Sequence, residues 1–315
     1  MKIDKIDKKI LFELSKNSRE SLNNIGKKVN LSKSSLLYRI KKLEENKIIY
    51  KYHTFINHSY LGKLYGRVAF NLFNISIEKL EESINLLKKL EEISWLGTTQ
   101  GKYDLCLGIC VKSIKELYQT INKIYEIIGK HVRHQDISLA YKIYNCASNV
   151  IFEEFLKPVE SFYTENYEKT NEFDIELINE LQNNSKINII ELSNRLNVST
   201  KKIISHKKEL EKTKKILRYS ILIDTIKLEY SSYHIFWKFN NFDIKEIEKL
   251  KKYLLSLKKT IYIVESVSSS DIETEFLVQN QRELYDLLFE IKNKFSNLIS
   301  HYDVMLIKEV FKNNL

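Results

Sequence analysis

The chain repeats itself at a constant offset of 167 residues, and this repeat limits its possible folds more than any other feature. Identical residues recur at that spacing, for example Asp7 with Asp174. Residues 116–118 and 283–285 both read Glu-Leu-Tyr in the same register. Because chance similarity does not keep one offset over many positions, the chain is a tandem duplication of a unit of roughly 150 residues.

The two copies are joined by residues 148–170, which we interpret as a linker. This segment contains the only proline, Pro158, and most of the polar run YTENYEKTNE at residues 163–172. Proline and clustered polar residues are typical of connections between domains. Besides this linker we expect four domains, at residues 1–57, 64–147, 171–224 and 231–315.

The composition is that of a globular protein without a membrane anchor. Hydrophobic residues make up 43% and charged residues 29% of the chain, which is enough apolar material for packed cores. No apolar run approaches the ~20 residues that a membrane helix needs, and the charged N-terminus does not resemble a signal peptide. Three sparse cysteines indicate small buried side chains in a reducing compartment. We therefore expect a cytoplasmic, nucleoid-associated protein.

Positive charge is concentrated in the first part of each copy. Residues 1–57 contain 14 Lys and Arg against 6 Asp and Glu, whereas residues 171–224 contain 10 against 8. The remaining segments are balanced, although the whole chain carries a formal charge of +10. A basic block on a small module favours a polyanionic partner, and the alternative is a solvated lysine-rich face.

The start of each copy has the pattern of a helix-turn-helix. Residues 4–20 are amphipathic, and Ser21 and Ser32 are suited to cap two further short helices. Two short helices after a supporting helix are typical of this DNA-binding motif. A strand pattern follows, so we expect a winged-helix-like module. The alternative is a three-helix bundle that contacts proteins.

The helix after Ser32 is the expected reading helix. Serines and an arginine near its start are suited to base edges, and the later lysines to phosphates. The residues that we predict to contact DNA are Lys33, Ser34, Ser35, Tyr38, Arg39, Lys41 and Lys42. In the second copy the predicted contacts are Lys201, Lys202 and His206. Because a histidine replaces the arginine there, we expect less base reading, and a purely structural role is the alternative.

The second part of each copy has a different pattern. Strand and helix periods alternate as strand, helix, strand, strand, helix and strand at residues 64–74, 77–90, 92–99, 103–111, 114–128 and 132–145. This order predicts a ferredoxin-like α+β domain with helices on one face of an antiparallel sheet. The other face needs cover, so we expect the two sheets of the chain to pair as an intramolecular pseudo-dimer.

These features together resemble the leucine-responsive regulator/AsnC family. The resemblance rests on the helix-turn-helix ending in LEENKIIYKY and on the Gly-x-Tyr-Asp turn at residues 101–104. It covers residues 1–145 and, more weakly, residues 171–315. It implies a DNA-binding domain followed by a small-molecule-sensing domain (the RAM domain), a double-stranded DNA partner and assembly through the sheets.

The resemblance also implies a site for an amino-acid effector at the central turn. The family pattern falls on Gly101 and Asp104, whereas the second copy reads Ser-Ser-Ser-Asp at residues 268–271 and lacks the glycine. The alternative is a turn that favours glycine and aspartate without binding anything. His131 and His134 have no companions that would complete a metal site, and we expect neither a metal nor another cofactor.

The sequence therefore predicts a sequence-specific, double-stranded DNA-binding transcription regulator and no enzyme. One alternative is an architectural protein that binds DNA with little specificity. The other is an enzyme similar in fold to the sirohaem decarboxylases, which would need His, Arg and Tyr side chains around a tetrapyrrole cleft. The central segment ISWLGTTQGKYDLCLGICV has neither histidine nor arginine, and we take this as evidence against that enzyme.

Overall fold

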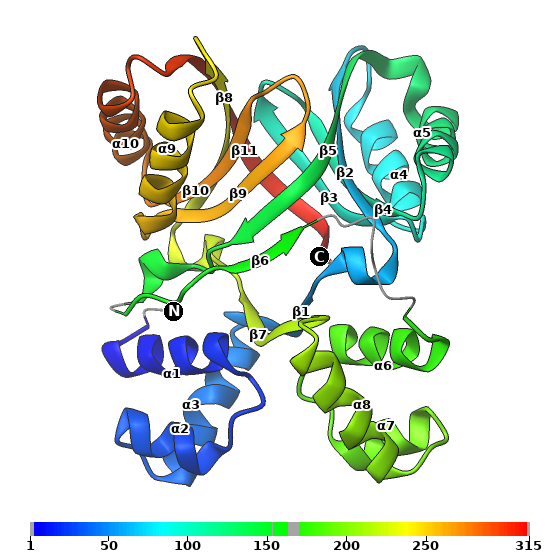
Figure 1. Ribbon diagram of the computed structural model, residues 1–315, viewed down its shortest axis with the longest axis vertical. Coiled ribbons are helices and arrows are strands. Elements are labelled where there is room, and N and C mark those ends of the chain that lie inside the picture. Colours follow the sequence, from blue (N-terminus) through cyan, green and yellow to red (C-terminus); the bar gives the residue numbers. More distant parts are fainter. Residues whose placement is uncertain (1–2, 153, 163–169, 314–315) are drawn as a thin grey trace.

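The computed structural model describes residues 3–152, 154–162 and 170–313. Figure 1 shows two layers, a β-barrel flanked by helices and, beneath it, two helical modules side by side. The two layers are connected by a ribbon of two strands. The two copies cross between the layers, so that α1–α3 (residues 5–45) lie beneath α9 and α10 (residues 244–294) of the other copy, and α6–α8 (residues 172–212) lie beneath α4 and α5 (residues 77–128) (Figure 1).

The two helical modules have the same order of elements. The first contains α1 (Lys5–Lys16), α2 (Leu22–Val29), α3 (Lys33–Glu45) and β1 (Ile49–Ile56). The second contains α6 (Glu172–Asn183), α7 (Ile189–Arg195), α8 (Thr200–Lys212) and β7 (Ile216–Ile223). The predicted first helix, residues 4–20, ends earlier than expected. Asn17 is extended, and the Ser18 N–H donates to the Tyr219 carbonyl in the other copy instead of continuing the helix.

The barrel is formed by the two ferredoxin-like units. The first unit contains β2 (Leu64–Leu72), α4 (Ile77–Leu87), β3 (Ile93–Gly101), β4 (Leu105–Val111), α5 (Ile114–Ile128) and β5 (Val132–Asn145). The second contains β8 (Ser231–Phe239), α9 (Ile244–Ser256), β9 (Thr260–Val267), β10 (Ile272–Val278), α10 (Gln281–Lys294) and β11 (Ile299–Asn313). All four helices lie on the outside of the barrel (Figure 1).

The two sheets join at both edges, which confirms the expected pseudo-dimer. The strand order is β2-β4-β3-β11-β8-β10-β9-β5, and β5 also pairs with β2, so the ring is closed. The long last strand of each unit makes this closure. The first part of β5 pairs with β2 and its last part with β9, and β11 likewise pairs with β8 and then with β3. A closed barrel leaves no exposed sheet edge between the two copies.

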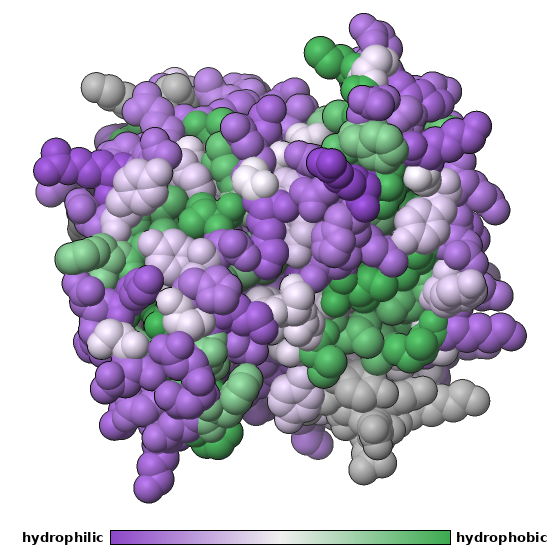
Figure 2. Space-filling model, turned by 90° about the horizontal axis from the view of Figure 1, so that it is seen from above, coloured by the Kyte–Doolittle hydropathy of each residue, from purple (hydrophilic) through white to green (hydrophobic). Residues whose placement is uncertain are grey.

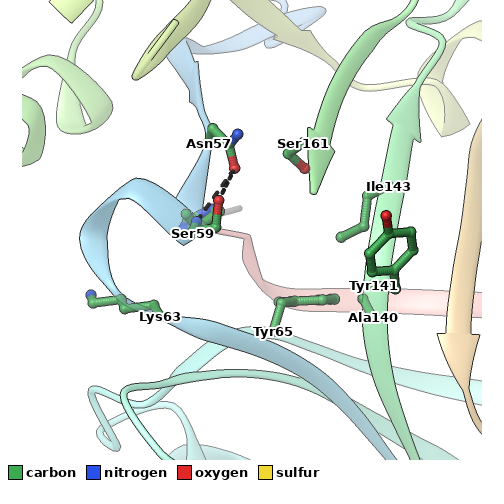
Figure 3. A pocket seen from close by; sticks show the side chains of 9 residues that line it. Asn57, Ser59, Lys63, Tyr65, Ala140, Tyr141, Ile143 and Ser161 are labelled. Carbon is green, nitrogen blue, oxygen red and sulfur yellow. Dashed lines mark hydrogen bonds between the residues drawn. The ribbon is translucent and has the colours of Figure 1, made fainter. Parts of the chain in front are cut away.

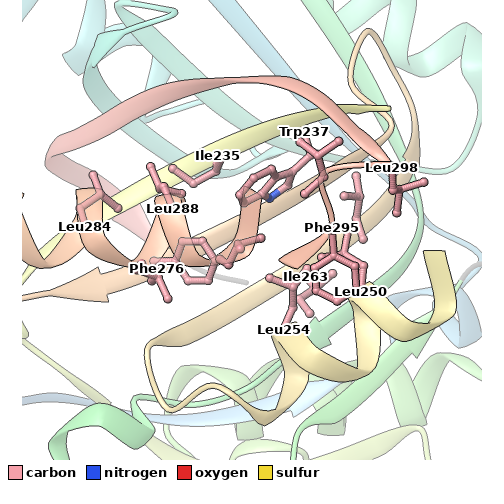
Figure 4. Packing of buried hydrophobic residues seen from close by; sticks show 14 of the residues in the cluster. Ile235, Trp237, Leu250, Leu254, Ile263, Phe276, Leu284, Leu288, Phe295 and Leu298 are labelled. Carbon is pink, nitrogen blue, oxygen red and sulfur yellow. The ribbon is translucent and has the colours of Figure 1, made fainter. Parts of the chain in front are cut away.

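Each unit has its own apolar core between sheet and helices. In the second unit, Trp237, Phe276 and Leu288 are fully buried between the sheet and helices α9 and α10 (Figure 4). The indole N–H of Trp237 donates to the Thr274 hydroxyl over 2.8 Å, so the polar edge of this large side chain is satisfied inside the core. These cores leave the inner face of the barrel free for polar residues.

The segment interpreted as a linker contains ordered structure. Strand β6 (Val159–Phe162) pairs with the end of β5. Buried Asn149 donates to the carbonyls of Cys146 and Leu156 and accepts from the Leu156 N–H, which holds the chain before the strand. Most of the polar run falls on residues 163–169, outside the described residues.

Candidate DNA-binding surface and barrel cavity

The two helix-turn-helix units are formed by α2 with α3 and by α7 with α8. The first reading helix starts as the sequence predicts, since the Ser32 hydroxyl accepts from the Ser35 N–H. The second starts in the same way, with the Ser199 hydroxyl accepting from the Lys202 N–H. Leu36, Ile40 and Leu43 bury the inner face of α3. The opposite face of α3 is therefore available for a partner. Both modules lie beneath the barrel, away from its outer helices (Figure 1).

Six of the seven residues predicted to contact DNA on α3 are exposed: Lys33, Ser34, Ser35, Tyr38, Lys41 and Lys42. Tyr38 has 70% of its surface exposed, which is unusual for an aromatic side chain without a partner to cover it. On α8, Lys201 and Lys202 are exposed as well. The Lys202 ammonium lies 4.1 Å from the ring centre of Phe173, so one face of this lysine packs against its own module.

Arg39 and His206 differ from the other predicted contacts because both are held inside their modules. The Arg39 guanidinium donates to Asp4 and Asp7, at 2.8 Å each. At the equivalent position of the second copy, the His206 ring lies 2.8 Å from Asp174. Both contacts tie the reading helix to the first helix of its module. This geometry supports a positioning role for these two residues more than contact with bases.

The two modules are fixed to each other across a pseudo-twofold axis. The hydroxyls of Ser18 and Ser185, equivalent residues of the two copies, are 2.6 Å apart. The Ser18 N–H donates to Tyr219 and the Ser185 N–H donates to Tyr52, so the contact is reciprocal. Strands β1 and β7 pair antiparallel at the same place. The spacing of the two reading helices is therefore set within one chain.

Gly101 and Asp104, the predicted effector residues, have structural roles in the turn between β3 and β4. Gly101 has a φ of +119°, and a Cβ there would lie 2.3 Å from the Val304 carbonyl oxygen. The Asp104 carboxylate accepts from the Leu72 N–H, and Asp271 makes the equivalent contact with Phe239. Because both copies keep this bond, the turn explains the aspartate without a ligand.

A cavity of about 570 Å³, which no pattern in the sequence indicated, extends from the barrel interior to the β1–β7 ribbon. A side pocket adjoins it, and Figure 3 shows Tyr65, Ile143 and Ser161 around this pocket, contributed by β2, β5 and β6. These three residues line the large cavity as well. Ligand sites in proteins are usually concave, mostly apolar and of this size.

A buried charge network crosses the inner face of the barrel. Arg67 on β2 donates to both oxygens of Glu273, at 3.1 Å each, and to Asp136 at 2.9 Å. The His234 ring lies 2.9 Å from Glu273 on the other side. Burial alone would raise the pKa of Glu273, but Arg67 and His234 outweigh it and hold that pKa far below its usual range. Of the described buried side-chain atoms, Arg67 Nη1 is among the few without a hydrogen-bond partner.

A signal for this network is present in the sequence. Arg67 and His234 are equivalent residues of the two copies, and each alternates with apolar neighbours along its strand. A charged residue among apolar neighbours on a strand whose faces are both covered indicates a polar interior. The contact between Arg67 and Glu273, however, joins the two copies and is not visible from one strand.

No helix in the described parts of the chain is long and apolar enough to cross a membrane. Among the same residues, no group of three or more His, Cys, Asp and Glu side chains is placed to hold a metal ion.

Comparisons with known proteins point to DNA-binding regulators. The family model for winged helix-turn-helix DNA-binding domains matches residues 3–50 and 170–216. The HTH-type transcriptional regulator Ptr1 of Methanocaldococcus jannaschii is 38% identical over 129 residues, which cover 40% of this chain and 85% of that protein. The HTH-type transcriptional regulator FL11 of Pyrococcus abyssi is 34% identical over 137 residues, which cover 44% and 89%.

A solved structure matches the arrangement of the whole chain. The siroheme decarboxylase NirDL superposes with a TM-score of 0.66 over 98% of this chain and 93% of that one, at 17% identity. At this identity the similarity shows a common fold and no common activity. The duplicated layout of helical modules and barrel is therefore known in another protein.

Proposed function

Because the chain belongs to the leucine-responsive regulator/AsnC family of HTH-type transcriptional regulators, we propose that it is a sequence-specific regulator that binds double-stranded DNA as a single-chain pseudo-dimer. The observation that carries this proposal is the pair of capped reading helices, fixed to each other through Ser18 and Ser185 and exposing lysines, serines and Tyr38. Regulators of this kind place two reading helices in successive major grooves about 34 Å apart.

The preferred DNA site is asymmetric. A homodimer presents the same surface twice and reads a palindrome, whereas here α3 and α8 expose different side chains. The first module carries more excess positive charge than the second, so it contributes more of the salt-sensitive affinity. The same proposal divides each copy into one DNA-binding and one barrel-forming domain. The DNA-binding domains are residues 1–57 and 171–224, and the barrel-forming domains are residues 64–147 and 231–315.

The effector and the state of assembly are less directly supported. An amino-acid effector at Gly101 and Asp104 stays a prediction from the family resemblance, and it would have to bind beside a turn whose carboxylate is already engaged. Association of pseudo-dimers is supported by exposed apolar side chains on the outer helices, among them Ile77, Tyr118, Ile244, Tyr285 and Phe289. Figure 2 shows apolar areas between hydrophilic side chains on the barrel end opposite the helical modules.

A sirohaem-decarboxylase-like enzyme is the second candidate, because Arg67, His234 and tyrosines meet in the barrel. Arg67 and His234 lie outside the central segment ISWLGTTQGKYDLCLGICV. The lack of histidine and arginine in that segment therefore does not exclude such an enzyme. The charges, however, do not suit a polycarboxylate: Arg67 is already paired with both Glu273 and Asp136, and burial lowers the pKa of the cavity residue His58 to about 4. A Soret shift on titrating sirohaem into the protein would support the enzyme, and an unchanged spectrum would dismiss it.

The test of the proposed function is selection of bound duplexes from a random pool, followed by salt titration on the enriched sequence. We would compare the native chain with Tyr38→Ala and Lys42→Ala. Lys89→Ala is the matched control, since it removes an equally exposed charge from the outside of the barrel. We expect an asymmetric motif, relaxed by Tyr38→Ala. Lys42→Ala should weaken all sequences alike and reduce the salt slope by about one.

Binding without an enriched motif would favour the architectural alternative. If the protein bound no duplex at ~50 mM salt, where phosphate contacts are strong, the proposal would be wrong.

A further inference from the structure

The cavity in the barrel has the composition of a binding site for an apolar molecule. Its walls are mostly apolar and aromatic, and they come from both copies and from the ribbon that carries the helical modules. The aromatic members are Tyr50 and Phe55 of β1, Tyr65 of β2, Trp95 of β3, Tyr230 directly before β8, and Tyr262 of β9. A mostly apolar cavity of about 570 Å³ has the size and composition usual for small-molecule sites.

One carboxyl group in this wall, that of Glu275, forms no ion pair among the described residues, although it lies opposite His234 on the neighbouring strand. Glu275 lines the cavity, and its only hydrogen-bond donor among the described residues is the Ser232 hydroxyl. Burial raises the pKa of Glu275 above its usual value, and the charge of His234 offsets this only in part. A buried acid without a partner is costly unless a counter-charge reaches it.

The basic residues around the cavity are already engaged or lie at its exposed rim. Arg67 and His234 are both bonded to Glu273. His58 is neutral near pH 7 because burial lowers its pKa to about 4. Lys308 is exposed to solvent. The deep part of the cavity therefore offers a carboxyl group that forms no ion pair among the described residues, near tyrosine and tryptophan rings whose faces attract positive charge.

We propose that the barrel cavity binds a mainly apolar organic amine, whose ammonium group pairs with Glu275 while its apolar part lies among the aromatic side chains. The site is asymmetric. At the position equivalent to Glu275, the first copy has Gly108, where a Cβ would lie 2.5 Å from the Tyr65 hydroxyl. One copy thus provides the carboxyl group, and the other provides the aromatic side chains of Tyr65 and Trp95, which lie against Gly108.

The position of the cavity links its occupancy to DNA binding. Its lower wall consists of Tyr50, Phe55 and Ile56 of β1 together with residues 217 and 220–223 of β7, the strands from which the two helical modules extend. A ligand that contacts both the barrel and this ribbon favours one position of the modules over others, and so changes the affinity for a fixed half-site spacing. This part of the inference rests on the proposed function.

Calorimetry on the full chain without DNA tests the binding step. The probes are phenylethylamine, its neutral analogue phenylethanol and its anionic analogue phenylpropionate. We expect saturable binding of the amine, with the two analogues weaker by about tenfold or more, since a charged hydrogen bond is lost. Glu275→Gln should reduce amine binding by a similar factor. Glu81→Gln, on the exposed face of α4, is the matched control and should leave it unchanged.

The ligand series needs no variant, so it decides even if Glu275→Gln fails to fold. Equal binding of amine and alcohol, or unchanged binding in a folded Glu275→Gln variant, would overturn the assignment. The selected duplex is then titrated with and without phenylethylamine. A changed dissociation constant in the native chain, absent in Glu275→Gln, supports the link to DNA, and no change refutes that link. Amine binding by a protein that binds no duplex would sink the proposed function and leave the cavity assignment standing.

Discussion

Arg67→Met tests the claim that charge pairing inside the barrel holds the two copies together. The variant keeps much of the side-chain volume but leaves Glu273 with His234 as its only cationic partner. Removing one partner of a buried ion pair costs about 3–5 kcal/mol, because the remaining charge stays buried without compensation. We expect a loss of that size in the free energy of unfolding of the barrel at pH 7.

The chain provides its own reporter for this experiment. Its two tryptophans, Trp95 on β3 and Trp237 on β8, both lie in the barrel, so fluorescence during denaturant unfolding follows this layer. The matched control is Arg195→Met, which also breaks two ion pairs, with Glu180 and Glu191. Its side chain is 51% exposed, so we expect little change in the free energy of unfolding.

The pH dependence gives a second readout. The pKa of Glu273 is lowered in the folded state, so its contribution to stability is complete above its unfolded value of about 4.5 and is lost as the pH falls toward the folded value. In Arg67→Met that pKa rises and the carboxyl is protonated more easily, so the difference between variant and native protein shrinks in acid. A variant within 1 kcal/mol of the native chain at pH 7, where the ~3–5 kcal/mol of a broken buried pair is expected, would refute the reasoning.

Three further predictions follow from the site geometry. Arg39→Ala should lower helix stability and weaken binding to all duplexes alike in competition assays, because Arg39 ties α3 to Asp4 and Asp7; a change confined to one base position would show that it reads DNA. Gly101→Ala should destabilise the barrel by roughly 1–3 kcal/mol in thermal melts, because alanine disfavours a φ of +119°, and an unchanged melt would contradict this. Ser18→Leu should weaken binding to the asymmetric site more than to either half-site alone, since Ser18 lies 2.6 Å from Ser185 on the pseudo-twofold axis; equal losses would mean that the modules act independently.

Much of the architecture follows from patterns that are local in the sequence. The constant offset predicts the pseudo-symmetry, which appears in paired contacts such as Asp104 with Leu72 and Asp271 with Phe239. Serine caps and apolar periods locate α2, α3 and α8, since a helix start and its buried face depend on residues within one or two turns. The early end of α1 was missed, because Asn17 and Ser18 are shaped by a contact with the other copy.

The closed barrel and its cavity depend on contacts that no local pattern contains. Alternation predicts the strands, but it does not tell that β5 changes partner from β2 to β9 near Leu139. Arg67 and Glu273 are far apart in the chain, and only strand order brings them together. The contact between Arg39 and Asp7 has a clearer signal in the sequence than the contacts in the barrel, because an acid and a basic residue occur at the same two positions in both copies.

The tandem arrangement explains how the barrel can hold such an unequal set of charges. Across the pseudo-twofold axis, Arg67 is equivalent to His234, Glu273 to Cys106 and Glu275 to Gly108. A homodimer of the first unit would keep Arg67 paired with Asp136 but would have no glutamate in the barrel, and a homodimer of the second would place four glutamates against two histidines. Burial of unpaired like charges is strongly unfavourable, so the second set does not suit a stable closed barrel. Only the joined chain combines one arginine with Glu273 and leaves Glu275 as a single carboxyl group facing an aromatic wall, an asymmetry that suits the ammonium group of the proposed ligand.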